Sequence, residues 1–558
     1  MPTEPEEPSR RGPGAGLLAA LLLTAALQIF IGMRSPIIAK DGMSFIRIAG
    51  ELREDAAATL QLEDQHPGYP AMILAGNYLA RRLPGISEFE CWILGARLAS
   101  GIAGVLSVAV VWLLARRLFD RRVADVAALL AAVWPLLRQN ASDALSDTPH
   151  FMFYLAGVWL TCEGLVRRQA RWFAAACAVS GLAYWIRPEG LIVGFTAALL
   201  LLVQLWRAEG QVRWRAVCKV AAMGLVMFAV AAPYGLLAGK LTSKKNPLQR
   251  EPSDLEIAAQ GVAATPGLLS EPLPGAKLPN ETARPDSIVG AIAAALYELG
   301  KEIGQGFYYL FLVPLFVWLC APSRLRPHFA ATWMTTVLIF CHMAMLVLLF
   351  LTAGYISHRH VIPLVGMMLP GTAAGTVWLA DRLADRWPAW TARLRIPLFR
   401  AIRAPSSSQA LTAIVLFMLA GLLPKTIKPL HEVYAPLVQA ALWVKQHARP
   451  GDQVLATSGY VRFYAGMPGL LLGPEVPNLP IGLVQEPDSR PWPFIVVEVD
   501  TRKFDCQQLC NPAAGYEQVL QIALHPRRKW PKVLVFASRS ANVSRLAAHE
   551  AAGGKASN

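Results

Sequence analysis

Residues 37–70 read IIAKDGMSFIRIAGELREDAAATLQLEDQHPGYP, and this stretch joins the first apolar run of the chain to the next. It places one acid, Asp41, where the chain is expected to leave a bilayer, and it ends in the motif HPGYP, His66–Pro70. Apolar residues recur at helical spacing from Phe45 to Leu52 and predict an amphipathic helix that lies on the membrane and pins Asp41 there. A carboxylate at such a place suits a general base in chemistry on a lipid-linked substrate.

The composition of the rest of the chain indicates a polytopic membrane protein. Of the 558 residues, 54% are hydrophobic and only 16% are charged, whereas soluble proteins average about 25% charged residues. The apolar residues form long runs of the length that a membrane span needs. The net charge of +15 does not indicate nucleic acid as a partner, because the arginines fall in short loops where they act as topology signals.

The apolar runs predict a polytopic α-helical membrane protein with about eleven transmembrane helices. Several of these runs are short or contain proline, which is tolerated where protein or a water-filled cavity surrounds the backbone. The expected spans are 15–33, 92–115, 122–138, 148–166, 171–186, 189–206, 215–238, 303–321, 329–352, 360–380 and 409–424.

Every second loop is basic, which predicts a cytoplasmic N-terminus and an uncleaved first span. The expected division is a cytoplasmic tail at 1–14, a membrane domain at 15–424, a soluble extracytoplasmic α/β domain at 430–540 and a tail at 541–558. The α/β domain is indicated by a helical pattern and four short strand-like runs. The loops at 34–91 and 239–302 are then external, and the second of them is long enough to be a lid or disordered.

Nearly all the unusual polar residues fall on the predicted external side of one membrane, where they form a candidate site. Asp143 and Asp147 are four residues apart, so a helix would place them on the same face; Asp147 also suits a helix N-cap. The HPGYP motif suits either a rigid turn or the start of a helix, and its His66 could instead bind phosphate or a metal. The remaining candidates are Arg187 and Glu189 in YWIRPEGL, and His358, Arg359 and His360 in SHRHVIPL.

Two of these motifs favour binding of an anion. Arg187 lies between two apolar runs, where an arginine is costly unless Glu189 or an anionic ligand pairs with it. Arg359 lies directly before a span, and a guanidinium donates two parallel hydrogen bonds to a phosphate. Ordinary anchoring at the lipid headgroups is the alternative for both motifs.

The order and sidedness of these motifs resemble GT-C fold glycosyltransferases of family 39, which include protein O-mannosyltransferases and bacterial aminoarabinose transferases that modify lipid A. The resemblance covers about residues 15–424. It is carried by the acid that opens the first external loop, the HPGYP turn, the run ISEFECWILGARLASGIAGVLSVAVVWLLARRLFDRRVADVAALLAAVWP, the acid before the fourth span, RPEGL and RHVIP.

The resemblance implies transfer of a sugar from a polyprenyl-phosphate-linked donor to an extracytoplasmic acceptor, which is a lipid, a glycan or a protein. Asp41 matches the proposed catalytic base, and Arg359 matches a position that faces the carrier phosphate, with His358 and Arg187 as further phosphate ligands. The expected location is the inner (plasma) membrane, with the active site on the extracytoplasmic side. Gly42 and His360 depart from the residues that are common in the family.

Two other classes of protein remain open from the sequence. A transporter or lipid flippase would place ionisable residues near the middle of the bilayer, whereas here they gather at one edge. A non-catalytic relative that binds the lipid carrier is the second alternative. The sequence leaves open the sugar, the acceptor, a divalent metal as cofactor and a disulfide between Cys506 and Cys510.

Overall fold

The computed structural model describes two compact units. The first contains residues 1–34, 44–251 and 265–428, and the second contains 35–43, 252–264 and 429–558. Within them, the structure describes residues 14–209, 214–240, 287–320, 329–393, 404–469, 492–499, 516–525 and 528–538. Cys506 and Cys510, and most of the predicted loop at 239–302, lie outside these ranges.

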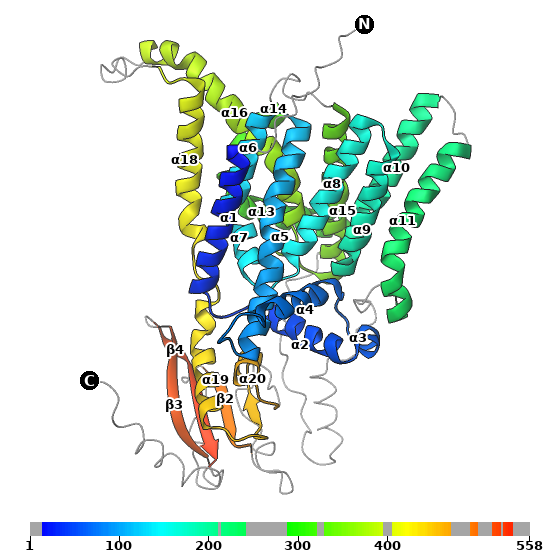
Figure 1. Cartoon of the computed structure of the whole chain (residues 1–558). Helices are drawn as coiled ribbons and strands as arrows, with labels where there is room; N and C mark the ends of the chain where they lie inside the picture. The colour runs from blue at the N-terminus through cyan, green and yellow to red at the C-terminus, as the bar shows by residue number, and fades with distance from the viewer. Residues whose placement is uncertain are drawn as a thin grey trace. The chain divides into compact units, whose positions relative to one another are not determined.

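Seven helical segments of the described ranges are long and apolar enough to cross a membrane. They lie side by side in the first unit (Figure 1). The predicted fold class, a polytopic helical membrane protein with a small C-terminal α/β domain, is confirmed. The seven spans come from α1 (Ala15–Arg34), α5 (Glu88–Leu118), η1 with α10 (Pro188–Gly190 and Leu191–Glu209), α11 (Trp214–Ala238), α15 (Phe329–Ala353), α16 (Ile362–Arg393) and α18 (Ser407–Thr426).

Shorter or more polar helices complete the first unit. They are α6 (Arg121–Val133), α7 (Pro135–Ser142), α8 (Asp147–Arg167), α9 (Ala170–Ile186), α13 (Ile288–Gly306) and α14 (Leu312–Cys320).

Two predicted spans are interrupted. The run 122–138 breaks between α6 and α7, where Pro135 occupies the first turn of α7 and lacks the N–H that a continuous helix needs. The predicted span 303–321 is wrong as one helix, because Tyr308 and Tyr309 have positive φ angles of 51° and 57° between α13 and α14.

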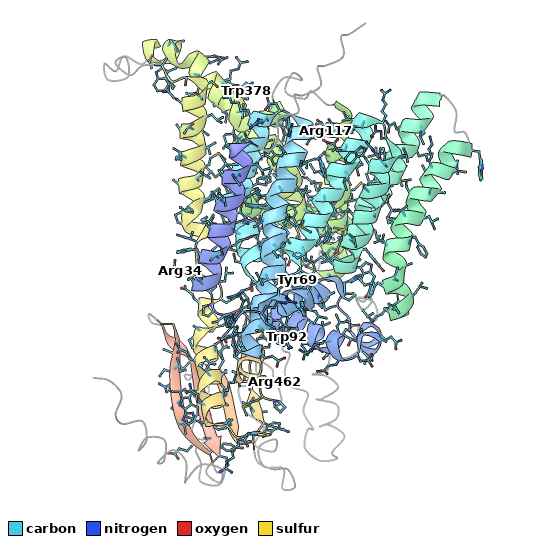
Figure 2. All side chains as sticks on the ribbon, viewed as in Figure 1. Arg34, Tyr69, Trp92, Arg117, Trp378 and Arg462 are labelled. Carbon is cyan, nitrogen blue, oxygen red and sulfur yellow. The ribbon has the colours of Figure 1, made fainter. Side chains whose placement is uncertain are left out.

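The two ends of the helical bundle differ in their residues. Trp92, near the start of α5, lies with Tyr69 at one end, and Arg117, near the end of α5, lies with Trp378 at the other (Figure 2). At the Arg117 end, Glu163 accepts hydrogen bonds from Arg117 at 2.9 Å and from Arg167 at 2.5 Å. These contacts join α5 to α8 at the end that the sequence predicts to be cytoplasmic.

The first predicted external loop is mostly helical. It forms α2 (Lys40–Glu54), α3 (Ala56–Leu62) and α4 (Gly68–Ala80). The predicted amphipathic helix is therefore present as α2. Its apolar face does not lie open to lipid, however, because Ile48 and Ala49 are buried and the ring of Phe45 meets that of Tyr69 edge-on at 5.1 Å.

The second unit contains a four-stranded sheet with the strand order β1-β2-β4-β3. β1 pairs with β2 in parallel, and the other two pairs are antiparallel. The helix and the four strands predicted from the sequence are all found, with α20 added between β1 and β2. The elements are η3 (Glu432–Tyr434), α19 (Ala435–His447), β1 (Val454–Ala456), α20 (Gly459–Ala465), β2 (Phe494–Val499), β3 (Tyr516–His525) and β4 (Arg528–Ser538).

Candidate active site

Asp147 is the centre of a polar cluster inside the first unit. It is the first residue of α8, and its side chain is only 3% exposed. Its Oδ1 lies 2.8 Å from Nη2 of Arg187, and its Oδ2 lies 3.9 Å from Nη1 of Arg359. One buried carboxylate therefore brings together two guanidiniums from distant parts of the chain.

Local structure explains how each residue of this cluster is presented. Arg187 follows α9 in an extended conformation (φ −153°, ψ 142°), and Pro188 then starts the short η1. The residue before a proline is disfavoured in the helical region, so the helix ends here and its last side chain turns inward. Arg359 lies in the turn between α15 and α16, three residues before Ile362 begins the next helix.

A small cavity of about 20 Å³ lies at this cluster, which is room for about one water molecule. Its polar lining contains both arginines, Asp147 and Glu189. Three histidines complete the polar lining, and Met345, Leu346, Leu349 and Pro363 form its apolar part; the histidines are His150, His342 and His360.

Two of these histidines were not predicted from the sequence. His342 is 1% exposed, and its Nε2 lies 3.3 Å from the carbonyl oxygen of His360. His150 is also buried, and its ring and that of His342 both contact the ring of Tyr154, at 5.8 and 5.5 Å between centroids. The signal that marks them in the sequence is an ionisable residue inside an otherwise apolar run.

The paired acids predicted at the start of the fourth span are only partly as expected. Asp143 is the C-cap of α7 with ψ 170°, and its Oδ1 accepts the N–H of Ala144 at 2.8 Å. It therefore lies outside α8, and the prediction that it shares a helix face with Asp147 is wrong. The alternative of Asp147 as an N-cap is also not observed, because Ser146 is the N-cap of α8.

Three of the other predicted residues line the cavity at Asp147, and a fourth does not. Arg187 pairs with Asp147, whereas the sequence had suggested Glu189 or a ligand as its partner. Glu189 and His360 line the same cavity as the two arginines. His358 is exposed and is not among the lining residues of that cavity.

The HPGYP motif packs against the segment that carries Arg187. Pro67 precedes α4, so the motif is a helix start, one of the two alternatives weighed for it. A Cβ at Gly68 would lie 2.6 Å from the carbonyl oxygen of Trp185, so only glycine permits this approach. Tyr69 is fully buried, which raises the pKa of its phenol, and its hydroxyl donates to the carbonyl of Ala96 at 3.1 Å.

His66 lies among aromatic rings. It is 4% exposed, and its ring centroid lies 5.3 Å from that of Tyr184 and 5.0 Å from that of Tyr234. Within the described part of the chain, no group of three or more His, Cys, Asp or Glu side chains is arranged to hold a metal ion. The structure thus gives His66 an aromatic environment.

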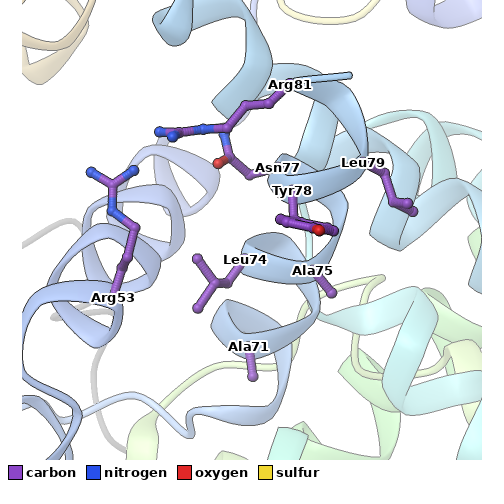
Figure 3. Close-up of a pocket in the computed structure, with 8 residues that line it drawn as sticks. All are labelled: Arg53, Ala71, Leu74, Ala75, Asn77, Tyr78, Leu79 and Arg81. Atoms are coloured by element: carbon purple, nitrogen blue, oxygen red, sulfur yellow. The ribbon is translucent and has the colours of Figure 1, made fainter. Parts of the chain in front are cut away.

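A second and larger cavity, of about 670 Å³, lies on α4 (Figure 3). Its lining is mostly apolar, with Arg53 and Arg81 at its edge, and the side chains of both arginines contact the carboxylate of Glu88. It shares no lining residue with the cavity at Asp147. No carboxylate or imidazole is found among its lining residues, so we take the smaller, polar cavity as the candidate anion-binding site.

Asp41 belongs to the second unit. It is exposed and lies in the first turn of α2. The segment that holds it, Ser35–Met43, is grouped with the C-terminal residues and not with the helical bundle. The sequence did not predict this grouping.

Comparisons with known proteins agree with the predicted resemblance. Residues 75–234 match the family described as dolichyl-phosphate-mannose-protein mannosyltransferase. Among curated protein sequences, none matches this chain.

Two solved structures share the fold over nearly the whole chain. ArnT from Cupriavidus metallidurans in the apo state is 15% identical, with a TM-score of 0.53, and the match covers 94% of this chain and 98% of ArnT. The same enzyme bound to undecaprenyl phosphate is 18% identical, with a TM-score of 0.52 and the same coverage. The resemblance to GT-C glycosyltransferases that the sequence predicted is confirmed by the family match and by this fold.

Proposed function

We propose that this protein is a membrane glycosyltransferase that moves a sugar from a polyprenyl-phosphate-linked donor to an extracytoplasmic acceptor. The observation that carries the proposal is the convergence of Arg187 and Arg359 on the buried Asp147 beside a cavity. Each guanidinium has five N–H donors, whereas one carboxylate offers only about four acceptor sites. The cluster thus has spare donors for a second anion, such as the phosphate of a lipid carrier, and the cavity of about 20 Å³ must widen to admit it.

The family match and the fold support this choice of reaction. The matched family is named for a dolichyl-phosphate-linked mannose donor, and the ArnT structure with the same fold holds undecaprenyl phosphate. In both cases the carrier is a polyprenyl phosphate. The seven helices that can cross a membrane fit such a lipid-linked donor, and we place the protein in the inner membrane, with its active site on the extracytoplasmic side.

The proposed mechanism is a single inverting displacement. The acceptor heteroatom forms a bond to the anomeric carbon as the bond from that carbon to the carrier phosphate oxygen breaks. The bonding electrons leave with the phosphate, whose developing charge is stabilised by Arg359 and Arg187. Asp41 takes the proton of the acceptor.

Release of the carrier lipid tests the proposed activity. Purified protein in lipid nanodiscs is incubated with a polyprenyl-phosphate sugar, with and without candidate acceptors, and the free polyprenyl phosphate is measured. We expect release that depends on the acceptor and on the amount of protein. A transporter or a non-catalytic binding protein would leave the donor intact, and that outcome would refute the proposal.

A further inference from the structure

The segment Ser35–Met43 is far along the chain from the residues it packs with in the second unit, because most of the helical bundle lies between them in the sequence. These nine residues are grouped with 429–558, although they directly follow the first membrane span. Asp41, the proposed catalytic base, lies within the segment. The contacts that hold this segment therefore also fix the position of the backbone that carries the Asp41 carboxylate.

Tyr464 makes two of the hydrogen bonds that hold the segment. The N–H of Ile38 donates to the hydroxyl oxygen of Tyr464 at 3.0 Å, and that hydroxyl lies 3.5 Å from the carbonyl oxygen of Pro36, to which it donates. One phenol thus satisfies both a backbone donor and a backbone acceptor of the segment. A second tie is the N–H of Leu430, which donates to Oγ of Ser35 at 2.8 Å.

Apolar side chains of the segment are buried beside these hydrogen bonds. Ile37 and Ile38 are 3% and 0% exposed, and Tyr464 is 5% exposed. Met43 is buried as well, and its Cε lies 3.9 Å from the place that a Cβ would take at Gly459, the first residue of α20. A buried backbone N–H that loses its partner is costly, so the contact with Tyr464 confines the backbone at Ile38.

This confinement extends to Asp41 through the start of α2. The N–H of Met43 donates to the carbonyl of Ala39 at 3.3 Å, which forms the first turn of the helix. Asp41 lies in that turn, three residues after Ile38, and its side chain is exposed. The backbone of Asp41 is therefore fixed from both sides, while its carboxylate faces outward.

We propose that Tyr464 is a positioning residue for the proposed base Asp41. The C-terminal α/β unit would in this way contribute to the rate of transfer. The inference rests on the proposed function. A general base must meet the acceptor proton in a narrow range of positions, and a misplacement of about 1 Å costs on the order of 10²-fold in rate. The hydroxyl of Tyr464 acts on the rate through the backbone and does not touch the substrate.

Tyr464→Phe tests this role, because it removes one hydroxyl and keeps the ring. Tyr516→Phe is the matched control: the hydroxyl of Tyr516 donates to the carbonyl oxygen of Trp492 at 3.0 Å in the same unit. With full-length protein in nanodiscs, we expect Tyr464→Phe to lower kcat about tenfold. The KM for the donor and for the acceptor should stay at the wild-type value, and Tyr516→Phe should retain the wild-type kcat.

Amide hydrogen exchange provides a measurement that does not depend on activity. We expect the peptide that covers residues 36–43 to exchange at least about tenfold faster in Tyr464→Phe than in wild type or in Tyr516→Phe, because local opening exposes the N–H of Ile38. Unchanged exchange together with unchanged kcat in Tyr464→Phe would overturn the inference. Equal losses in both variants would also overturn it, since they would indicate general destabilisation.

The two experiments separate this inference from the proposed function. If Asp41→Asn remains active, the assignment of Asp41 as the base fails, and with it the effect of Tyr464 on catalysis. Faster exchange in Tyr464→Phe would then still demonstrate that Tyr464 holds the segment. If Asp41→Asn is inactive and Tyr464→Phe behaves as wild type in both measurements, the proposed function stands and the positioning role is refuted.

Discussion

At Asp147, a carboxylate with 3% side-chain exposure depends on Arg187 and Arg359 for its charge balance. The arginine partners are 22% and 34% exposed, so the acid is the most buried member of the three. Removing one partner of a buried ion pair costs more than the pair itself contributes, because the remaining charge is left in a poorly solvated place. Stability and the proposed phosphate binding therefore depend on the same three side chains.

A double-mutant cycle tests this dependence. We expect Arg187→Gln to lower the free energy of unfolding by about 1–3 kcal/mol, as followed by denaturation in detergent. Asp147→Asn in the Arg187→Gln background should recover part of that loss. The control is Arg53→Gln, which breaks an exposed pair with Glu88 and should change the stability by less than about 1 kcal/mol. Additive effects at Arg187 and Asp147 would contradict the buried pair.

Glu302 on α13 is a buried acid, and we expect its protonation to affect the stability. It is 7% exposed, and burial raises its pKa, against the opposing effects of His358 and Lys301. A carboxyl group whose pKa is higher in the folded state binds its proton more tightly there. Its contribution to stability is then fully present below the unfolded pKa of Glu and is lost as the pH rises through the folded pKa.

Glu302→Gln is expected to remove this dependence. Wild-type protein should lose unfolding free energy as the pH rises from about 4.5, and the Gln variant should lose less over the same range. Glu54→Gln, which alters an exposed acid on α2, serves as the control and should keep the wild-type slope. Parallel pH curves for wild type and Glu302→Gln would contradict this account.

At the scale of elements, α4 is placed by the close approach of Gly68 to the backbone before Arg187. A methyl group there would lie 2.6 Å from the carbonyl oxygen of Trp185, so the backbone has to move. By contrast, a Cβ at Gly50 in α2 would meet nothing within 4 Å. Substitutions at these two glycines therefore test whether transfer requires the contact between the HPGYP motif and the segment that carries Arg187.

Gly68→Ala should lower both the stability and the rate of transfer, because either α4 or the segment that carries Arg187 must shift. Gly50→Ala should leave transfer unchanged and stabilise the protein by about 0.5–1 kcal/mol, since alanine costs less conformational entropy in a helix. Both variants are compared by denaturation and by release of the carrier lipid. An active and stable Gly68→Ala variant would show that the contact is dispensable.

Helices and strands followed from the sequence where runs of apolar residues are bounded by polar ones. The predicted span 92–115 lies within α5 (Glu88–Leu118), and the four predicted strand-like runs correspond to the four strands. Asp143 was misplaced for the opposite reason: spacing of four residues implies one face only if a single helix contains both acids, and α7 and α8 are separate helices here. Local patterns do not tell where two helices meet.

At the scale of the molecule, the pairing of distant segments is what the sequence could not provide. Arg187 and Arg359 were both predicted to bind phosphate, yet nothing in their spacing indicates that Asp147 joins them. The attachment of Ser35–Met43 to the C-terminal residues through Tyr464 is a further long-range contact of this kind. Such contacts depend on packing of the folded chain, which carries no local signature in the sequence.

Substitution of Asp41 determines whether this residue is the base of the proposed glycosyl transfer. The measurement is the initial rate of acceptor-dependent release of polyprenyl phosphate by Asp41→Asn in nanodiscs. The control is Asp64→Asn, which alters an exposed acid of the same loop, 3.8 Å from Nζ of Lys240. The account predicts a loss of about 10²-fold or more for Asp41→Asn and the wild-type rate for Asp64→Asn; the wild-type rate in Asp41→Asn would contradict it.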